Sequence, residues 1–234
     1  MMSDGSLSQD EIDALLAGVD SSAISGGGSS AATATVSKPS PSYDTGALES
    51  FFSSTTGSLS SNLSALTGVN VSLGGPQVST FGRDNFLPQL PDMVTVITAN
   101  YTSGFPGEHI FILPEGTAKA IASLMTKEDD IQLDDMAMSV IGEVVSQLVG
   151  TQITALTDKT GNKSIAAASP TAANVPKATA ALPAGDFAAM TYNLDLGDGL
   201  AHQMWEILSA SVAGDISGGL NGGSGASKIG RAHV

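Results

Sequence analysis

The sequence predicts an α/β (α+β) domain in which an antiparallel sheet packs with long helices. Three observations indicate this class: strand-length apolar runs at 93–102 and 108–114, one long amphipathic segment at 133–156, and an internal repeat. Strands that follow one another through a short turn favour antiparallel pairing. With 234 residues, 41 % of them hydrophobic, the chain is long enough for one sizeable core.

The first predicted elements are a helix, a strand and a hairpin. One long helix or a helix pair is expected over Asp44–Leu66, and "VNVSL" at 69–73 reads as a short strand. The β-branched alternation of "MVTVITANYT", 93–102, predicts a strand, which the turn "SGFPG" joins to "EHIFILP" as a hairpin partner. A helix over Thr117–Met125 follows.

The longest periodic element is "LDDMAMSVIGEVVSQLVGTQITAL", 133–156, which predicts a core helix. Its apolar face comprises Val140, Ile141, Val144, Val145, Leu148 and Val149. Two apolar runs on either side of Gly197–Gly199 predict a final hairpin that carries Trp205 into the core. Gly74–Gly75–Pro76 is interpreted as a turn, because no Lys-Ser/Thr pair follows it as in a phosphate-binding loop.

The internal repeat relates a segment that starts at Ser53 to one that starts at Ser146, 93 residues later. Both carry serine, then glycine four residues on, leucine six after that, and a proline 19 or 20 residues beyond the glycine. The repeat predicts a pseudo-twofold duplication of a helix–strand unit. Chance similarity between serine- and glycine-rich segments is the alternative.

The chain is expected to have five parts. They are an amphipathic peptide (1–20), a flexible linker (21–41), the domain (42–216), a Gly/Ser linker to a missing C-terminal domain (217–227), and a terminal heptapeptide (228–234). The heptapeptide, "KIGRAHV", can be back-translated into the start of a common sequencing-adapter sequence, so we interpret it as an artefact and exclude it from the fold.

The opening stretch "GSLSQDEIDALLAGVD" has the sequence signals of a short amphipathic helix. Ser8 and Glu11 form a capping box, and Ile12, Leu15 and Leu16 make one narrow apolar edge. Isolated helices of this length are marginal in water, so we expect the peptide to fold in a groove of a partner. Docking on its own domain is the alternative.

Composition excludes several classes of function. The formal net charge of −14 disfavours nucleic acid and anionic membranes and favours a neutral or basic protein partner. The chain has no cysteine, and its three histidines form no zinc-spaced cluster, so we expect no metal and no cofactor. No secretory signal and no run of 18 apolar residues is found, which favours a cytoplasmic protein without membrane insertion.

The N-terminal motif resembles the peptide of the flagellar motor switch proteins FliM and FliY that binds the phosphorylated chemotaxis regulator CheY. The residues in register are Leu7, Ser8, Gln9, Glu11, Ile12, Asp13, Ala14, Leu15 and Leu16. The resemblance implies that these residues bind phosphorylated CheY. It also implies a place in the switch ring on the cytoplasmic face of the flagellar basal body, with FliM, FliG and FliN-like proteins as neighbours.

The central domain is similar to the CheC/FliY-type module. CheC-group phosphatases carry Glu, then Asn three residues later, then Pro about 23 further on. Here Glu143 matches, Ser146 stands in the Asn position, and Pro170 is one residue late; the first half has Ser50 and Ser53 instead.

A seryl hydroxyl cannot replace the carboxamide that aligns the attacking water, and Gln147 is displaced by about 100° round the helix. We therefore predict a degenerate phosphatase with Glu143 and Ser146 as its remnant. A solvated polar face is the alternative for these two residues.

Other candidate residues have simpler interpretations. His109 and His202 lie in strand patterns and are expected to be ordinary sheet residues, and the acidic run 128–135 a solvated loop and helix start. The leading hypothesis is a switch-ring component that captures phosphorylated CheY, and the second is an active CheY phosphatase. An unrelated acidic adaptor is the third.

Overall fold

The computed structural model describes residues 42–223. The predictions for the CheY-binding peptide (1–20), the linker (21–41) and the adapter-like heptapeptide (228–234) lie outside this range. Within it, the described residues form one unit of the chain.

Two long helices dominate the domain, α2 (Thr45–Thr67) and α5 (Asp135–Thr160). Each begins at an aspartate N-cap whose carboxylate accepts the backbone N–H three residues on, which satisfies one of the free donors of the first turn. Each ends at a glycine in the left-handed region, Gly68 at φ 74° and Gly161 at φ 71°. Of the two alternatives predicted over Asp44–Leu66, one long helix or a helix pair, the structure has the single helix, and the core helix predicted over 133–156 is confirmed.

Nine short or medium strands and five shorter helical segments complete the described part. The strands are β1 (Ser72–Leu73), β2 (Gln77–Phe81), β3 (Met93–Thr98), β4 (Tyr101–Ser103), β5 (His109–Pro114), β6 (Ala166–Ala167), β7 (Thr171–Pro176), β8 (Phe187–Asp195) and β9 (His202–Ser209). The helical segments are α3 (Arg83–Phe86), η1 (Leu87–Gln89), α4 (Glu115–Thr126), η2 (Lys177–Thr179) and α6 (Ala210–Gly223).

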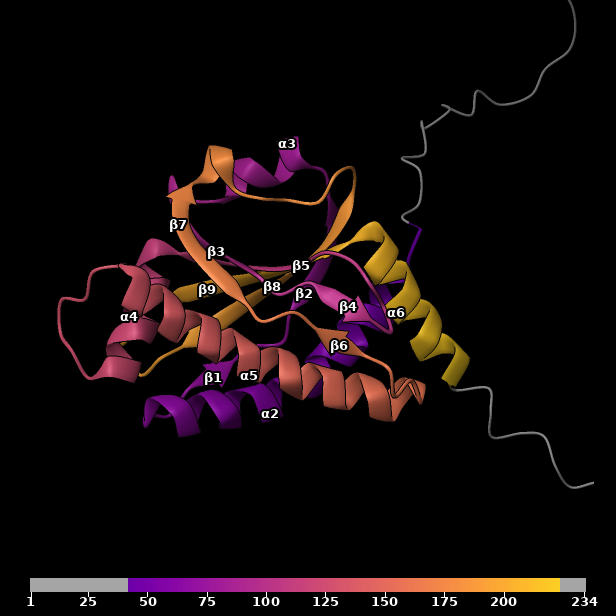
Figure 1. Cartoon of the computed structure of the whole chain (residues 1–234), viewed down its shortest axis with the longest axis horizontal. Coiled ribbons are helices and arrows are strands. Elements are labelled where there is room, and N and C mark those ends of the chain that lie inside the picture. The colour runs from indigo at the N-terminus through magenta and orange to yellow at the C-terminus, as the bar shows by residue number, and fades with distance from the viewer. Residues whose placement is uncertain (1–41, 224–234) are drawn as a thin grey trace, which may run out of the picture. The chain divides into compact units, whose positions relative to one another are not determined.

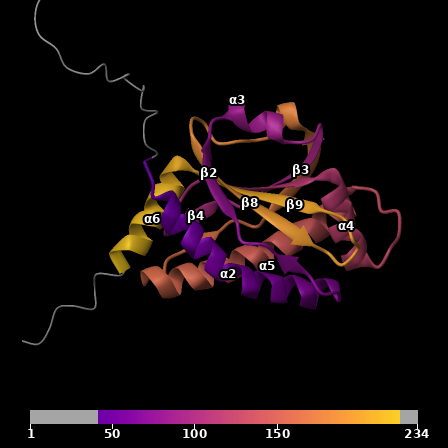
Figure 2. The same ribbon diagram turned by 180° about the vertical axis from the view of Figure 1, so that it is seen from behind.

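Seven of the strands form the main antiparallel sheet with the order β1-β8-β9-β5-β3-β7, in which β2 also pairs with β8. β4 and β6 form a separate two-stranded sheet. Helices α2, α4, α5 and α6 cover one face of the main sheet, and α3, η1 and η2 cover the other (Figures 1 and 2). The antiparallel α+β class predicted from the sequence is therefore confirmed.

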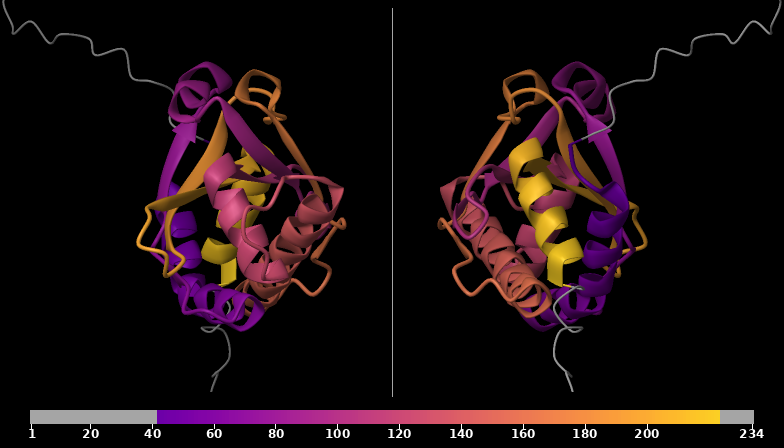
Figure 3. Two further views of the ribbon diagram at one scale, coloured as in Figure 1. Left: turned by 90° about the vertical axis from the view of Figure 1, so that its left-hand side faces the viewer. Right: turned by 90° about the vertical axis from the view of Figure 1, so that its right-hand side faces the viewer.

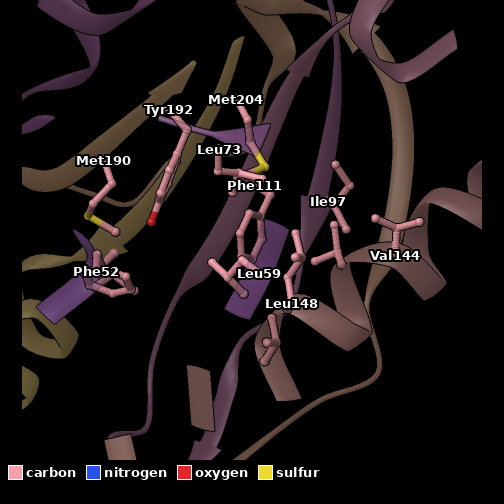
Figure 4. Packing of buried hydrophobic residues seen from close by; sticks show 14 of the residues in the cluster. Phe52, Leu59, Leu73, Ile97, Phe111, Val144, Leu148, Met190, Tyr192 and Met204 are labelled. Carbon is pink, nitrogen blue, oxygen red and sulfur yellow. The ribbon is translucent and has the colours of Figure 1, made fainter. Parts of the chain in front are cut away.

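Two apolar cores lie on opposite faces of the sheet. The larger joins the long helices to β5, β8 and β9 and includes Phe52, Leu59, Phe111 and Leu148 (Figure 4). The smaller lies under α3 and η1, where Phe86 packs edge-on against Trp205 at 6.3 Å between ring centroids. Trp205 is thus a core residue, as predicted.

The duplication predicted from the repeat is visible in the fold. Each half runs from a long helix through an edge strand and a central hairpin to a shorter helix, and each edge strand pairs with a central strand of the other half, β2 on β8 and β7 on β3. In each half a crossover segment connects the edge strand to the central hairpin, residues 82–92 in the first half and 177–186 in the second. The two crossover segments lie side by side above the sheet (Figure 3). The buried positions of α2 recur 93 residues later in α5: Leu48, Phe51, Phe52, Thr55, Leu59 and Leu63 correspond to Ile141, Val144, Val145, Leu148, Gln152 and Leu156.

Each crossover segment also carries a basic side chain that donates hydrogen bonds to backbone carbonyl oxygens of the other. Arg83, the first residue of α3, donates to the carbonyl oxygens of Ala178 and Ala180. Lys177, the first residue of η2, donates to the carbonyl oxygen of Leu90 at 3.0 Å. Because each contact satisfies the end of a short helix in the other half, the two halves stabilise each other reciprocally.

Three predictions of element boundaries were wrong. The strand at 93–102 divides into β3 and β4, and the strand at 69–73 shrinks to β1. The linker predicted from residue 217 is helical as far as Gly223, because Val212, Ala213 and Ile216 of α6 are buried in the larger core. A Cβ at Gly219 would lie 3.2 Å from Thr160, so glycine permits this close helix contact.

The helix α5 is long and apolar enough to span a membrane by length and composition alone. Within the described residues, however, its apolar side chains pack against α2, α4 and the sheet, as expected for the central helix of a core. We interpret it as a core helix.

Candidate functional site

The candidate site is a groove of about 500 Å³ between α5 and the segment that leads into β7. It contains both residues predicted as the phosphatase remnant. Its lining comprises Asp135, Met138, Ser139, Gly142, Glu143 and Ser146 from α5, and Ser169, Pro170, Thr171 and Ala172 from the opposite wall.

One wall of the groove is a single face of α5. The α5 members recur at intervals of three or four residues, so they share one face of the helix. The opposite wall is positioned by the pairing of β7 with β3, in which Thr171 lies opposite Thr98. Gly142 faces this wall, and a Cβ there would make an ordinary van der Waals contact of 3.7 Å with the carbonyl oxygen of Pro170.

The carboxylate of Glu143 is exposed at the edge of the groove. It accepts a hydrogen bond of 2.9 Å from the side-chain amide of Gln147, one turn further along α5. Gln147 itself does not contribute to the lining, whereas the half-buried Ser146 does. The nearest carboxamide therefore lies on the outer side of Glu143, and the polar group facing the groove beside Glu143 is a hydroxyl.

Ser146 stands where two hollows meet. It also lines a smaller hollow of about 210 Å³, together with Val149, Gly150, Ile153 and residues 167–170. The groove thus continues along α5 past Ser146. A surface of this length suits contact with a protein segment better than enclosure of a small molecule.

The equivalent face of the first half is organised differently. Ser50 and Ser53 of α2 correspond to Glu143 and Ser146 in the confirmed 93-residue register. The neighbouring Glu49 accepts the backbone N–H of Val78 on β2 at 3.2 Å, so its carboxylate holds an edge strand. The first half therefore offers no free carboxylate in the Glu143 position.

The acidic run before α5 is solvated, as predicted. Glu128, Asp129, Asp130, Asp134 and Asp135 are all exposed, and Asp134 is the N-cap. Negative charge at this end of a helix is favoured by the helix dipole. Between residues 42 and 223, no group of three or more His, Asp or Glu side chains is arranged to hold a metal ion.

His202 connects the final hairpin to α4. Its Nε2 donates to Asp198 at 2.8 Å, and its Nδ1 lies 3.2 Å from the hydroxyl of Thr117. The backbone N–H of Leu200 and, next, the contact with His202 hold the pKa of Asp198 below its ordinary value. His202 lies on β9 and His109 on β5, so both are sheet residues as predicted.

Most of the groove was not found by sequence reasoning. Counting back from Glu143 by three or four residues would have indicated Ser139 and Asp135. On the opposite wall the sequence had singled out Pro170 alone, as the proline of the CheC-group motif. Ser169, Thr171 and Ala172 have no local signal, because their place depends on the pairing of β7 with a strand some 75 residues earlier in the chain, Thr171 opposite Thr98. The predicted partner-binding residues Leu7, Ser8, Gln9, Glu11, Ile12, Asp13, Leu15 and Leu16 lie outside the described residues.

The fold is similar to that of solved FliY and FliM structures. The domain resembles Thermotoga maritima FliY (TM-score 0.68, 19 % identity, 76 % of this chain and 96 % of that chain). It also resembles Helicobacter pylori FliM in a complex with SpeE (TM-score 0.63, 12 % identity, 78 % and 96 %). At these identities the likeness concerns the fold.

In sequence, the chain is 29 % identical over 166 residues to the flagellar motor switch phosphatase FliY of Bacillus subtilis. The match covers 66 % of this chain and 40 % of that protein, so the chain spans well under half the length of the relative it matches. No protein-family model matches the chain.

Proposed function

We propose that this chain is a component of the flagellar motor switch that binds phosphorylated CheY through Leu7–Leu16 and couples chemotaxis signalling to motor rotation. The observation that carries the proposal is the 29 % identity to a FliY whose name places it in the motor switch. The FliY and FliM fold of residues 42–223 and the N-terminal motif support it independently.

The order of segments suggests how capture would work. The motif precedes about twenty residues without apolar periodicity, a composition typical of a tether. Tethering raises the effective concentration of a short peptide near the ring, while fold-on-binding keeps each contact reversible. Both properties suit a receptor that must follow a changing signal.

The proposed location and partners follow from the same similarity. The domain would lie in the cytoplasm at the basal body, on the inner face of the membrane, in a ring with FliM, FliG and FliN-like proteins. A fold relative, Helicobacter pylori FliM, has been solved in complex with FliG (TM-score 0.55, 12 % identity, 71 % of this chain and 95 % of that chain). A FliG-like neighbour is therefore the first partner to test.

Phosphatase activity is the second candidate function. Two observations favour phosphatase activity. The exposed carboxylate of Glu143 lies in a groove that can accept a segment of a partner protein, and the relative in Bacillus subtilis is named a phosphatase. It is opposed by Ser146, whose hydroxyl is too short to align a water where an asparagine would. We therefore propose binding without efficient catalysis.

The decay of labelled phosphorylated CheY distinguishes the two functions. It is measured with the whole chain, with Glu143→Ala, and with the 1–22 peptide, while binding is recorded in parallel. Ser50→Ala, at the equivalent position of α2, is the matched control.

We expect binding by both chain and peptide with an unchanged rate of decay. Faster decay that is lost in Glu143→Ala and retained in Ser50→Ala would establish the phosphatase instead. Absence of binding would refute the proposed capture.

A further inference from the structure

A buried polar cluster lies in the larger core, outside the groove. At its centre is the carboxylate of Glu206 on β9, which is fully buried. Its Oε1 lies 2.8 Å from Nε2 of His109 on β5, and its Oε2 accepts hydrogen bonds from Gln152 of α5 at 2.9 Å and Tyr192 of β8 at 2.8 Å. One side chain thus joins three strands and one helix.

The cluster is enclosed by aromatic rings. Tyr101 stacks on His109 with an interplanar angle of 3° and a centroid distance of 4.8 Å, and the ring of Phe111 lies 4.7 Å from the imidazole at an interplanar angle of 52°. Burial and the negative charge of Glu206 raise the pKa of Tyr192 well above its ordinary value. Tyr192 therefore stays a hydrogen-bond donor at any physiological pH.

Gln152 is the point at which this cluster holds α5. It is the one buried polar side chain of that helix, whose other buried residues are apolar or glycine, such as Val145, Leu148 and Val149. Apolar contacts are non-directional and tolerate sliding, whereas a hydrogen bond in a dry core is lost when its partner moves by a turn. Setting register is the best-attested role of buried polar groups in packed helices.

The first half of the domain has no such cluster at the equivalent positions. In the 93-residue register Gln152 corresponds to Leu59 of α2. The strands β5 and β9 correspond with an offset of 95, since each ends immediately before its helix, so Glu206 corresponds to Phe111. Leu59 and Phe111 are both buried in the same core (Figure 4). Within residues 42–223, this polar contact is made by the long helix that bears the groove and not by the equivalent position of α2.

We infer that Glu206, acting through Gln152, is a positioning residue that fixes the axial position of α5 and with it the geometry of the Glu143–Ser146 groove. Glu143 and Ser146 precede Gln152 by nine and six residues, about 13 Å and 9 Å along the helix axis. Because the helix is continuous, an axial shift at Gln152 is transmitted to both. The opposite wall, 169–172, is held by the sheet and does not follow.

Spin labels measure this position directly, and the cysteine-free chain allows them to be placed uniquely. Cysteines replace the exposed Asp158 near the end of α5 and the exposed Gln203 at the start of β9 in the full-length chain. The distance distribution between the labels is compared in four backgrounds. Gln152→Met and Glu206→Leu remove the contact, Glu206→Gln keeps a hydrogen-bonding side chain of the same shape, and Leu59→Met is the matched control on α2.

We expect Gln152→Met and Glu206→Leu to broaden or shift the distribution by up to about one helical turn, 5.4 Å. Glu206→Gln and Leu59→Met should retain the narrow distribution. An unchanged distribution in Gln152→Met, or an equal change in Leu59→Met, would overturn the inference even if stability falls.

Gln152→Met conserves volume, so it keeps the test informative if Glu206→Leu does not fold. The measurement reads a position and needs no CheY, so its result is separate from that of the proposed function.

Discussion

Introducing the carboxamide that the CheC-group motif has at position 146 is the sharpest perturbation of the groove. Ser146→Asn places an amide on the groove wall beside Glu143, in the half whose carboxylate is exposed. An asparagine extends about 1 Å further from the backbone than serine, and an error of about 1 Å in the position of a reacting group costs roughly 10²-fold in rate. We therefore expect Ser146→Asn to accelerate the decay of phosphorylated CheY by about 10²-fold over the unmodified chain.

The assay is single-turnover decay of labelled phosphorylated CheY at saturating protein. Ser53→Asn is the matched control, because it adds the same amide to α2, where Ser50 replaces the glutamate and Glu49 is bound to Val78. Glu143→Ala combined with Ser146→Asn should return the decay to its original rate. A folded Ser146→Asn chain that binds CheY but leaves the decay unchanged would refute the water-positioning argument.

Three further predictions concern the motif and the stability of the domain. Ile12→Ala or Leu16→Asp should abolish capture of phosphorylated CheY while the thermal melt of the domain stays unchanged; calorimetric titration beside a melting curve checks both. Phe52→Ala, which empties a fully buried site, should lower the free energy of unfolding by about 3–5 kcal/mol in urea titrations, and a loss under 1 kcal/mol would contradict the packing. Asp198→Asn should be less stable than the unmodified chain at pH 7. Because the folded-state pKa of Asp198 is lowered, its stabilisation is present above the unfolded value of about 3.9 and lost as pH falls through the folded value. The two urea midpoints should therefore converge as the pH falls below about 3.9, and a constant difference would show that the carboxylate charge is not responsible.

Local signals were sufficient to predict most of the helices. Apolar residues at intervals of three and four predicted which face of α2 and α5 enters the core, and the predicted ranges lie within a few residues of the ends that the aspartate and glycine caps set. The same holds for β5 and the β8–β9 hairpin, whose apolar runs and turn residues lie within a few residues of one another. The 93-residue repeat could be detected for the same reason, because the residues that repeat lie within the two long helices.

What depended on distant segments could not be read from the chain. The strands β2 and β7 are short and partly exposed, and they exist because each pairs with the opposite half. The glycine-rich α6 is helical because the core receives Val212 and Ile216, which outweighs its low intrinsic propensity.

The candidate site likewise has one part that local sequence signals indicate and another that depends on long-range contacts. The sequence indicated Glu143 and Ser146 through the resemblance to the CheC/FliY-type module, and their spacing of three residues places them on one face of a helix. Only the tertiary structure decided that 169–172 closes the groove and that Gln152 meets Glu206 across the core. These contacts join residues some 25 to 54 positions apart, and their geometry is set by sheet pairing and by the packing of a helix on that sheet, which no local pattern encodes.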